Sequence, residues 1–173
     1  MDSLDALAGR EAELYVAVER AVGLMEDQER ALAAAGVFAA YGEVLRGYVR
    51  LLDRPGAAPE ALKRAAFLVW YEMAEPACFS GVRDLPEDAV HAALAGLDAA
   101  AAGGAIDAEL AAMLGYYWTL ADYAFARGGP WSALGPALAA SDPDAWRADV
   151  PAPAEPWARG QMGAYWAGVS RVA

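Results

Sequence analysis

Residues 65–71 read Ala-Ala-Phe-Leu-Val-Trp-Tyr, seven consecutive side chains that are all apolar or aromatic. Successive side chains of a helix point about 100° apart, so such a run covers every direction around the axis. A helix that is apolar all round is buried on all sides. Pro59 suits the first turn of this helix, where its missing N–H is harmless, and Pro76 ends it. We therefore expect residues 59–74 to form the central helix of a helical domain.

Helix is also expected on both sides of this run. Alanine-rich segments with apolar residues three and four apart dominate the chain, whereas the β-branched residues that favour strands are few. Clusters of glycine, proline and aspartate are expected to interrupt the helices. The expected main helices are 3–22, a long helix from the break at 23–27 to Leu52, 59–74, a helix capped by Asp84 that ends near Ala102, and 107–127.

The last quarter of the chain has a different character. Four of the six tryptophans, at positions 131, 146, 157 and 166, lie there. Residues 151–156 read Pro-Ala-Pro-Ala-Glu-Pro, which predicts an extended linker, and a short final helix should follow it. Soluble monomers rarely expose this much aromatic surface. The segment 151–173 is therefore expected to pack on a single helical domain, 1–150, or on a partner subunit.

The predicted fold class is all-α, an irregular bundle of about five main helices with a Trp-rich C-terminal helical segment. Helix starts near residues 3, 59 and 107 also leave open a HEAT-like stack of hairpins, although the residues at matching offsets are not alike.

Composition and charge limit the partners and the compartment. The chain is 58% hydrophobic and carries a formal net charge of −11. An acidic surface repels nucleic acid and anionic membranes, so neither is an expected partner. No helix-compatible uncharged stretch reaches the roughly 18 residues that a membrane span needs. The acidic N-terminus and the single cysteine, Cys78, predict a soluble protein in a reducing cytoplasm. The single lysine, Lys63, and the absence of asparagine are typical of a GC-rich genome and suggest a bacterial source.

Familiar catalytic patterns are missing from the sequence. One histidine, His91, and one cysteine are too few for a zinc ribbon or finger or a His-rich metal site. The sequence contains no phosphate-binding glycine loop and no Gly-x-Ser-x-Gly element. We therefore predict no catalytic residue, no metal ligand and no cofactor.

The end of the expected central helix combines aromatic rings with carboxylates, since residues 70–75 read Trp-Tyr-Glu-Met-Ala-Glu. Glu72 and Glu75 are three residues apart, so they share one face of the helix. Carboxylates beside Trp and Tyr can bind a cation, a metal or an amine. They can equally form a salt bridge with Arg83 or simply reach solvent.

A second aromatic cluster lies in the expected helix 107–127. Its adjacent rings point in different directions, so this helix should have two buried faces. A pocket between helices 59–74 and 107–127 is the predicted ligand site. Its expected walls are Trp70, Tyr71, Tyr117 and Trp118, and its expected polar groups are Glu72, Glu75 and Arg83.

Two functions remain open on the sequence. The lack of catalytic motifs beside a surplus of aromatic residues favours a non-catalytic interaction module, which binds another protein or its own copy through the acidic face or the C-terminal aromatic segment. The alternative is a small-molecule-binding protein or an atypical enzyme with the pocket near Trp70–Glu75. The environment of Glu72 distinguishes them, because a buried Glu72 without an arginine partner indicates a site.

Overall fold

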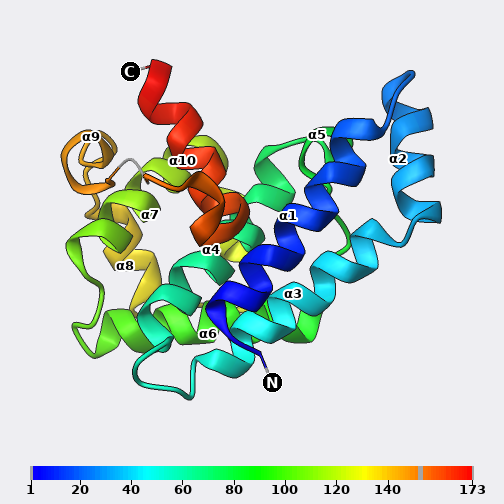
Figure 1. Ribbon diagram of the computed structural model, residues 1–173. Helices are drawn as coiled ribbons and strands as arrows, with labels where there is room; N and C mark the ends of the chain where they lie inside the picture. The colour runs from blue at the N-terminus through cyan, green and yellow to red at the C-terminus, as the bar shows by residue number, and fades with distance from the viewer. Residues whose placement is uncertain (1, 152–153, 173) are drawn as a thin grey trace.

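The computed structural model describes residues 2–151 and 154–172. These residues form ten α-helices and two short 3-10 helices, and none of them belongs to a β-strand (Figure 1). The α-helices are α1 (Leu4–Arg20), α2 (Met25–Ala34), α3 (Val37–Leu51), α4 (Ala58–Ala74), α5 (Ala77–Ser80), α6 (Glu87–Ala102), α7 (Ala108–Ala121), α8 (Leu134–Ala139), α9 (Trp146–Asp149) and α10 (Gly160–Val172). The 3-10 helices are η1 (Asp122–Ala126) and η2 (Pro156–Arg159). The all-α prediction is confirmed, whereas the predicted number of main helices and the HEAT-like alternative are not.

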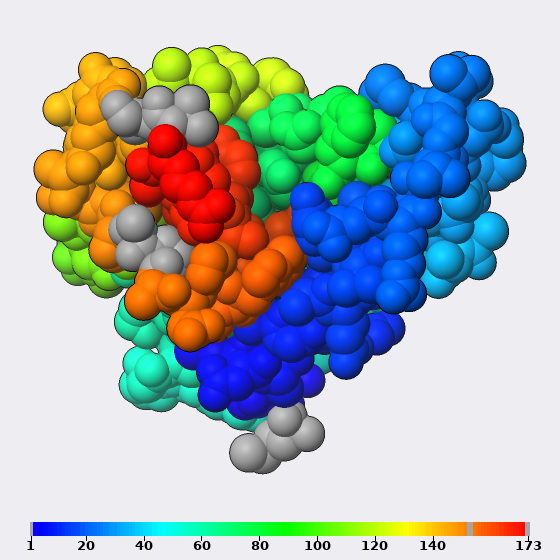
Figure 2. Space-filling model, turned by 45° about the horizontal axis from the view of Figure 1, so that its top comes forward, coloured from blue at the N-terminus to red at the C-terminus, as the bar shows by residue number. Residues whose placement is uncertain are grey.

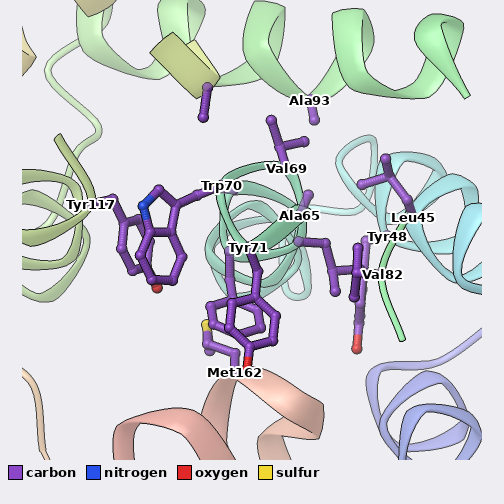
Figure 3. Close-up of a cluster of buried hydrophobic side chains, with 14 of the residues drawn as sticks. Leu45, Tyr48, Ala65, Val69, Trp70, Tyr71, Val82, Ala93, Tyr117 and Met162 are labelled. Atoms are coloured by element: carbon purple, nitrogen blue, oxygen red, sulfur yellow. The ribbon is translucent and has the colours of Figure 1, made fainter. Parts of the chain in front are cut away.

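Helix α4 lies at the centre of the bundle and is buried from Ala61 to Tyr71. Helices α3, α6, α7 and α10 all pack against it. Figure 3 shows that successive side chains of α4 meet different neighbours, since Val69 points to α6, Trp70 to α7 and Tyr71 to α10. The apolar run therefore has a partner in each direction, as expected of a helix without a polar face.

Three expected helix boundaries are wrong. The long second helix is two helices, α2 and α3, because Gly36 between them adopts a left-handed conformation with φ of 73°. Asp84 does not cap α6, which begins after Pro86; Asp84 itself has a positive φ of 53°. The expected helix 107–127 is α-helical only to Ala121 and continues as η1.

The C-terminal segment packs on the same chain. Helix α10 lies against α1, α4 and η2, and in Figure 2 the orange part of the C-terminal segment adjoins the blue N-terminal helix. Trp166 is 2% exposed and Met162 is 1% exposed. Trp157, the first residue after the expected linker, lies in η2 and packs on Tyr15 with 5.1 Å between ring centroids. Residues 152 and 153 of the expected linker lie outside the described residues.

A network of ion pairs joins η2 to the central helix. Arg159 pairs with Glu60 of α4 at 2.7 Å and with Glu109 of α7. Lys63 of α4 lies 2.6 Å from Glu109 and 2.7 Å from Asp107. Each charge of this partly buried network has an opposite charge beside it, which offsets the cost of removing it from water.

A buried carboxylate lies where α10 meets α1. Oε2 of Glu11 accepts a hydrogen bond from the backbone N–H of Gln161 at 2.5 Å. Oε1 of Glu11 and the hydroxyls of Tyr41 and Tyr48 are buried without a hydrogen-bond partner among the described residues. Burial raises the pKa of Glu11 to about 7. Gly160 has a positive φ of 64°, and a Cβ there would overlap the Glu11 carboxylate, so this junction requires glycine.

No helix in the described part of the chain is both long enough and apolar enough to span a bilayer.

Candidate ligand-binding site

The structure brings together three of the predicted pocket residues. Trp70 stacks on Tyr117 with 4.3 Å between ring centroids and on Tyr71 with 5.8 Å. All three are buried, and the indole N–H of Trp166 donates to the Tyr117 hydroxyl at 3.1 Å. The rings pack against one another, and the hollows described below are lined by other residues. These three residues therefore form part of the core.

The fourth predicted wall residue, Trp118, lies apart from this stack. It is partly buried and lines a small hollow of about 180 Å³ together with Phe125, Trp131 and Leu138. Because Tyr117 and Trp118 are consecutive residues of α7, their side chains face different parts of the bundle. Tyr117 and Trp118 are separated because this helix has two buried faces, as the sequence predicted.

The predicted polar groups are also separated. The Glu72 carboxylate accepts a hydrogen bond from the Leu85 N–H at 2.6 Å and pairs with Arg127. Arg83 does not reach Glu72; it pairs with Glu29 of α2 at 2.5 Å. Glu75 is half-buried and forms no ion pair with any residue that the structure describes. The Glu72 side chain is therefore only 9% exposed and has an arginine partner, and that pairing indicates a structural role.

The Glu72–Arg127 pair should be measurable as stability. We expect Arg127→Met to lower the free energy of unfolding by about 2 kcal/mol, because it leaves the largely enclosed Glu72 carboxylate without its counter-ion. Adding Glu72→Gln removes that charge but leaves an acceptor for the Leu85 N–H, so the double variant should recover at least half of the loss. Urea denaturation of the unaltered protein and of these two variants measures both effects.

Arg83→Met is the matched control, because the Arg83 side chain is 46% exposed and its ion pair should contribute less than about 1 kcal/mol. An Arg127→Met loss no larger than that of the control would contradict the structural role of the pair.

A wide, open hollow lies between α7, α9 and α10. Its volume is about 750 Å³. We call it the aromatic hollow, and its lining residues are Tyr116, Trp146, Arg147, Ala164, Tyr165, Gly168 and Val169. Its walls belong to the same aromatic cluster as the predicted pocket, because Tyr165 lies 5.4 Å from Trp70 between ring centroids.

Two features give the aromatic hollow polar character. The Arg147 guanidinium lies over the Trp146 ring, with its Cζ 4.6 Å from the ring centroid. The hydroxyls of Tyr116 and Tyr165 are 2.8 Å apart and share a hydrogen bond. Burial, and next the hydrogen bond with Tyr116, raise the pKa of Tyr165, so its hydroxyl keeps its proton at neutral pH. The hollow thus combines apolar ring faces with a few polar groups, as ligand sites do.

Sequence reasoning missed the residues that line the aromatic hollow. Its rings come from α7, α9 and α10, which are far apart in the chain, and no local spacing links Tyr116 to Trp146 or Tyr165. The one available signal was the concentration of tryptophans in the last quarter of the chain.

A second, more apolar hollow lies between α4, α6 and α7. Its volume is about 300 Å³, and alanine and leucine side chains form most of its wall. Lys63 and Asp107, which also line it, pair with each other at 2.7 Å. Because these two charges neutralise each other, this hollow offers fewer free polar groups to orient a ligand than the aromatic hollow does.

Within the described residues, no group of three or more His, Cys, Asp or Glu side chains is placed to hold a metal ion. Comparison of the chain with protein-family models, with curated proteins and with solved structures finds no match.

Proposed function

We propose that the protein binds a small, ring-containing organic molecule in the aromatic hollow. The observation that carries this proposal is a hollow of about 750 Å³ with Tyr116, Trp146 and Tyr165 among its lining residues. Pockets for small ligands typically measure about 300–1,000 Å³ and are lined by aromatic and apolar side chains with a few polar groups. Ala164 and Gly168, which also line the hollow, add little bulk to it.

The aromatic rings that line the hollow explain why a ligand that contains a ring would bind there. Aromatic side chains pack against other rings in offset or edge-on arrangements and gain about 1 kcal/mol per pair beyond the area that they bury. Tyr116 and Trp146 meet edge-on at 5.6 Å, and Tyr116 and Tyr165 are tilted at 6.3 Å. A flat ligand that enters this cluster meets ring faces and ring edges together.

The other candidate, an interaction module that associates through the C-terminal aromatic segment, has less support. This candidate was inferred from the many aromatic residues near the C-terminus, which have to be buried against some surface. Trp166 is buried by helices of the same chain, and Trp157 packs on Tyr15. Association with a partner protein or a second copy therefore remains a prediction from the sequence. The single cysteine, Cys78, is free and buried, which supports the predicted cytoplasmic location of such a binding protein.

Filling the hollow tests this function. Gly168 lies on α10, and a Cβ added there meets no atom within 4 Å. The substitution Gly168→Leu should therefore occupy space in the hollow without straining the fold, and it replaces a poor helix former with a good one. We expect phenyl-naphthylamine, a neutral ring compound that fluoresces in apolar surroundings, to bind the unaltered protein at one saturable site. Gly168→Leu should weaken that binding at least about tenfold, or 1.4 kcal/mol.

Gly9→Leu provides the matched control. Gly9 is an exposed glycine in α1, and a Cβ there also meets no atom within 4 Å. We expect this variant to bind the probe like the unaltered protein. Binding that is unchanged in Gly168→Leu, or that is lost equally in both variants, would refute the site.

A further inference from the structure

The polar groups of the aromatic hollow also indicate the chemical class of its ligand. Resting on the function proposed above, we propose that the hollow selects a planar organic anion, whose ring packs among Tyr116, Trp146 and Tyr165 and whose charged group pairs with Arg147.

Arg147 differs from the arginines that stabilise the fold. Arg64, Arg127 and Arg159 each form close ion pairs with carboxylates. The Arg147 guanidinium makes no hydrogen bond to any described residue, and its Nε is 3.6 Å from Asp144, an exposed neighbour in the same turn. Its position comes instead from the Trp146 ring beneath it. Its N–H donors therefore remain available, and a planar guanidinium binds carboxylate, sulfonate or phosphate groups through two parallel hydrogen bonds.

The sign of the charge decides between an anion and a cation. Aromatic faces alone also attract cations such as quaternary ammonium groups. Arg147, however, is the one charged side chain among the described residues that line the hollow, and it already covers a face of Trp146. A second cation would be repelled by the guanidinium, whereas an anion is attracted to it. Asp144, whose Oδ1 lies 3.6 Å from the Arg147 Nε, offsets part of this charge but is not among the residues that line the hollow.

The hydroxyl pair also favours a ligand that accepts hydrogen bonds. In the Tyr116–Tyr165 contact one hydroxyl donates to the other, so the second O–H remains free to donate to a third group. The hollow therefore offers donors from Arg147 and from this pair. A ligand with acceptor oxygens, such as a ring compound with a carboxylate or sulfonate group, satisfies both.

Two probes that share a ring system but differ in charge test this inference. Anilinonaphthalene sulfonate carries a sulfonate, and phenyl-naphthylamine is its neutral counterpart. We expect the sulfonate to bind the unaltered protein at least about tenfold more tightly. Arg147→Met, which keeps an apolar stem over Trp146 but removes the charge, should reduce the affinity for the sulfonate to that for the neutral probe. The neutral probe should bind this variant unchanged, and Arg147→Lys should keep part of the preference.

Arg10→Met is the control, because Arg10 is exposed on α1 and pairs with Glu13; it should leave both affinities unchanged. Circular dichroism verifies that each variant is folded. The anion preference is overturned, and the binding site stands, in one case. In that case both probes bind with equal affinity, Arg147→Met changes neither affinity, and Gly168→Leu weakens both. If the sulfonate binds tightly but is insensitive to Gly168→Leu, it binds elsewhere and the inference is overturned. If neither probe shows binding that Gly168→Leu weakens, both proposals are overturned.

Discussion

Trp166→Ala is expected to lower the free energy of unfolding by about 4 kcal/mol, the typical loss when a large buried aromatic side chain is truncated. Trp166 is 2% exposed, and its ring packs within 5.0 Å of Tyr116 and 6.0 Å of Trp146 between centroids. The substitution also removes the hydrogen bond from the indole N–H to the Tyr117 hydroxyl. Urea denaturation followed by circular dichroism measures the loss.

Trp157→Ala is the matched control in the same segment. Trp157 is half-buried and has one ring partner, Tyr15, so we expect its truncation to cost about 1 kcal/mol. Equal losses for the two variants would mean that the C-terminal segment is not held mainly by the burial of Trp166. A loss below 1 kcal/mol for Trp166→Ala would contradict the packing of α10 on the bundle.

Glu11→Gln is expected to raise the free energy of unfolding by about 3 kcal/mol at pH 8, which is unusual for a change in a buried, hydrogen-bonded residue. Burial raises the pKa of Glu11 from 4.5 to about 7 in the folded protein. The folded state therefore binds this proton more tightly than the unfolded state does. The resulting stabilisation is present in full below pH 4.5 and is lost as the pH rises to about 7 and above. Glutamine stays neutral at every pH and avoids this loss.

Opposing effects act on the pKa of Glu11, and their relative sizes decide whether it is raised or lowered. The N–H of Gln161 at the start of α10 and the Arg64 guanidinium of α4 both favour the ionised carboxylate. A helix N-terminus is worth up to about 2 kcal/mol to a negative charge. Desolvation outweighs these effects because the Glu11 side chain is fully enclosed and Oε1 has no partner among the described residues. Gln in this position keeps an oxygen for the Gln161 N–H.

Unfolding of the two proteins at pH 5 and at pH 8 measures the linkage. The stability difference between Glu11→Gln and the unaltered protein should be small at pH 5 and should reach its full size at pH 8. Glu13→Gln is the control, since the Glu13 side chain is 71% exposed, and it should change little at either pH. A loss of stability in Glu11→Gln at pH 8 would show that the ionised form of Glu11 is the one that holds α10.

The central part of the fold could be predicted because the relevant signals are local. The apolar run at 65–71 has no polar face, and Pro59 and Pro76 lie at or near the ends of the helix that contains it. The break at Gly36 could not be predicted in the same way, because alanines before it favour helix and one glycine in a helix costs only about 1 kcal/mol. Packing of Leu32 and Val37, both buried, outweighs that local preference.

The candidate site was less predictable because its contacts join distant residues. Trp70, Tyr71 and Tyr117 do come together, as their helices were expected to be neighbours. A salt bridge to Arg83 is one of the alternatives that the sequence leaves open for Glu72, whereas the actual partner, Arg127, is 55 residues away. The aromatic hollow likewise depends on how α9 and α10 pack on α7, and spacing along the chain carries no information about that arrangement.

The tryptophan side chains offer the most direct test of the aromatic hollow. The chain has six tryptophans, and a two-dimensional nitrogen–proton NMR spectrum resolves one indole signal for each of them. The signal of Trp146, which lines the hollow, can be assigned by its disappearance in Trp146→Phe. On titration with anilinonaphthalene sulfonate we expect the Trp146 signal to move most, while those of Trp118 and Trp131 in the smaller hollow stay in place. Movement confined to Trp118 and Trp131, or no movement of Trp146 at saturation, would contradict the account.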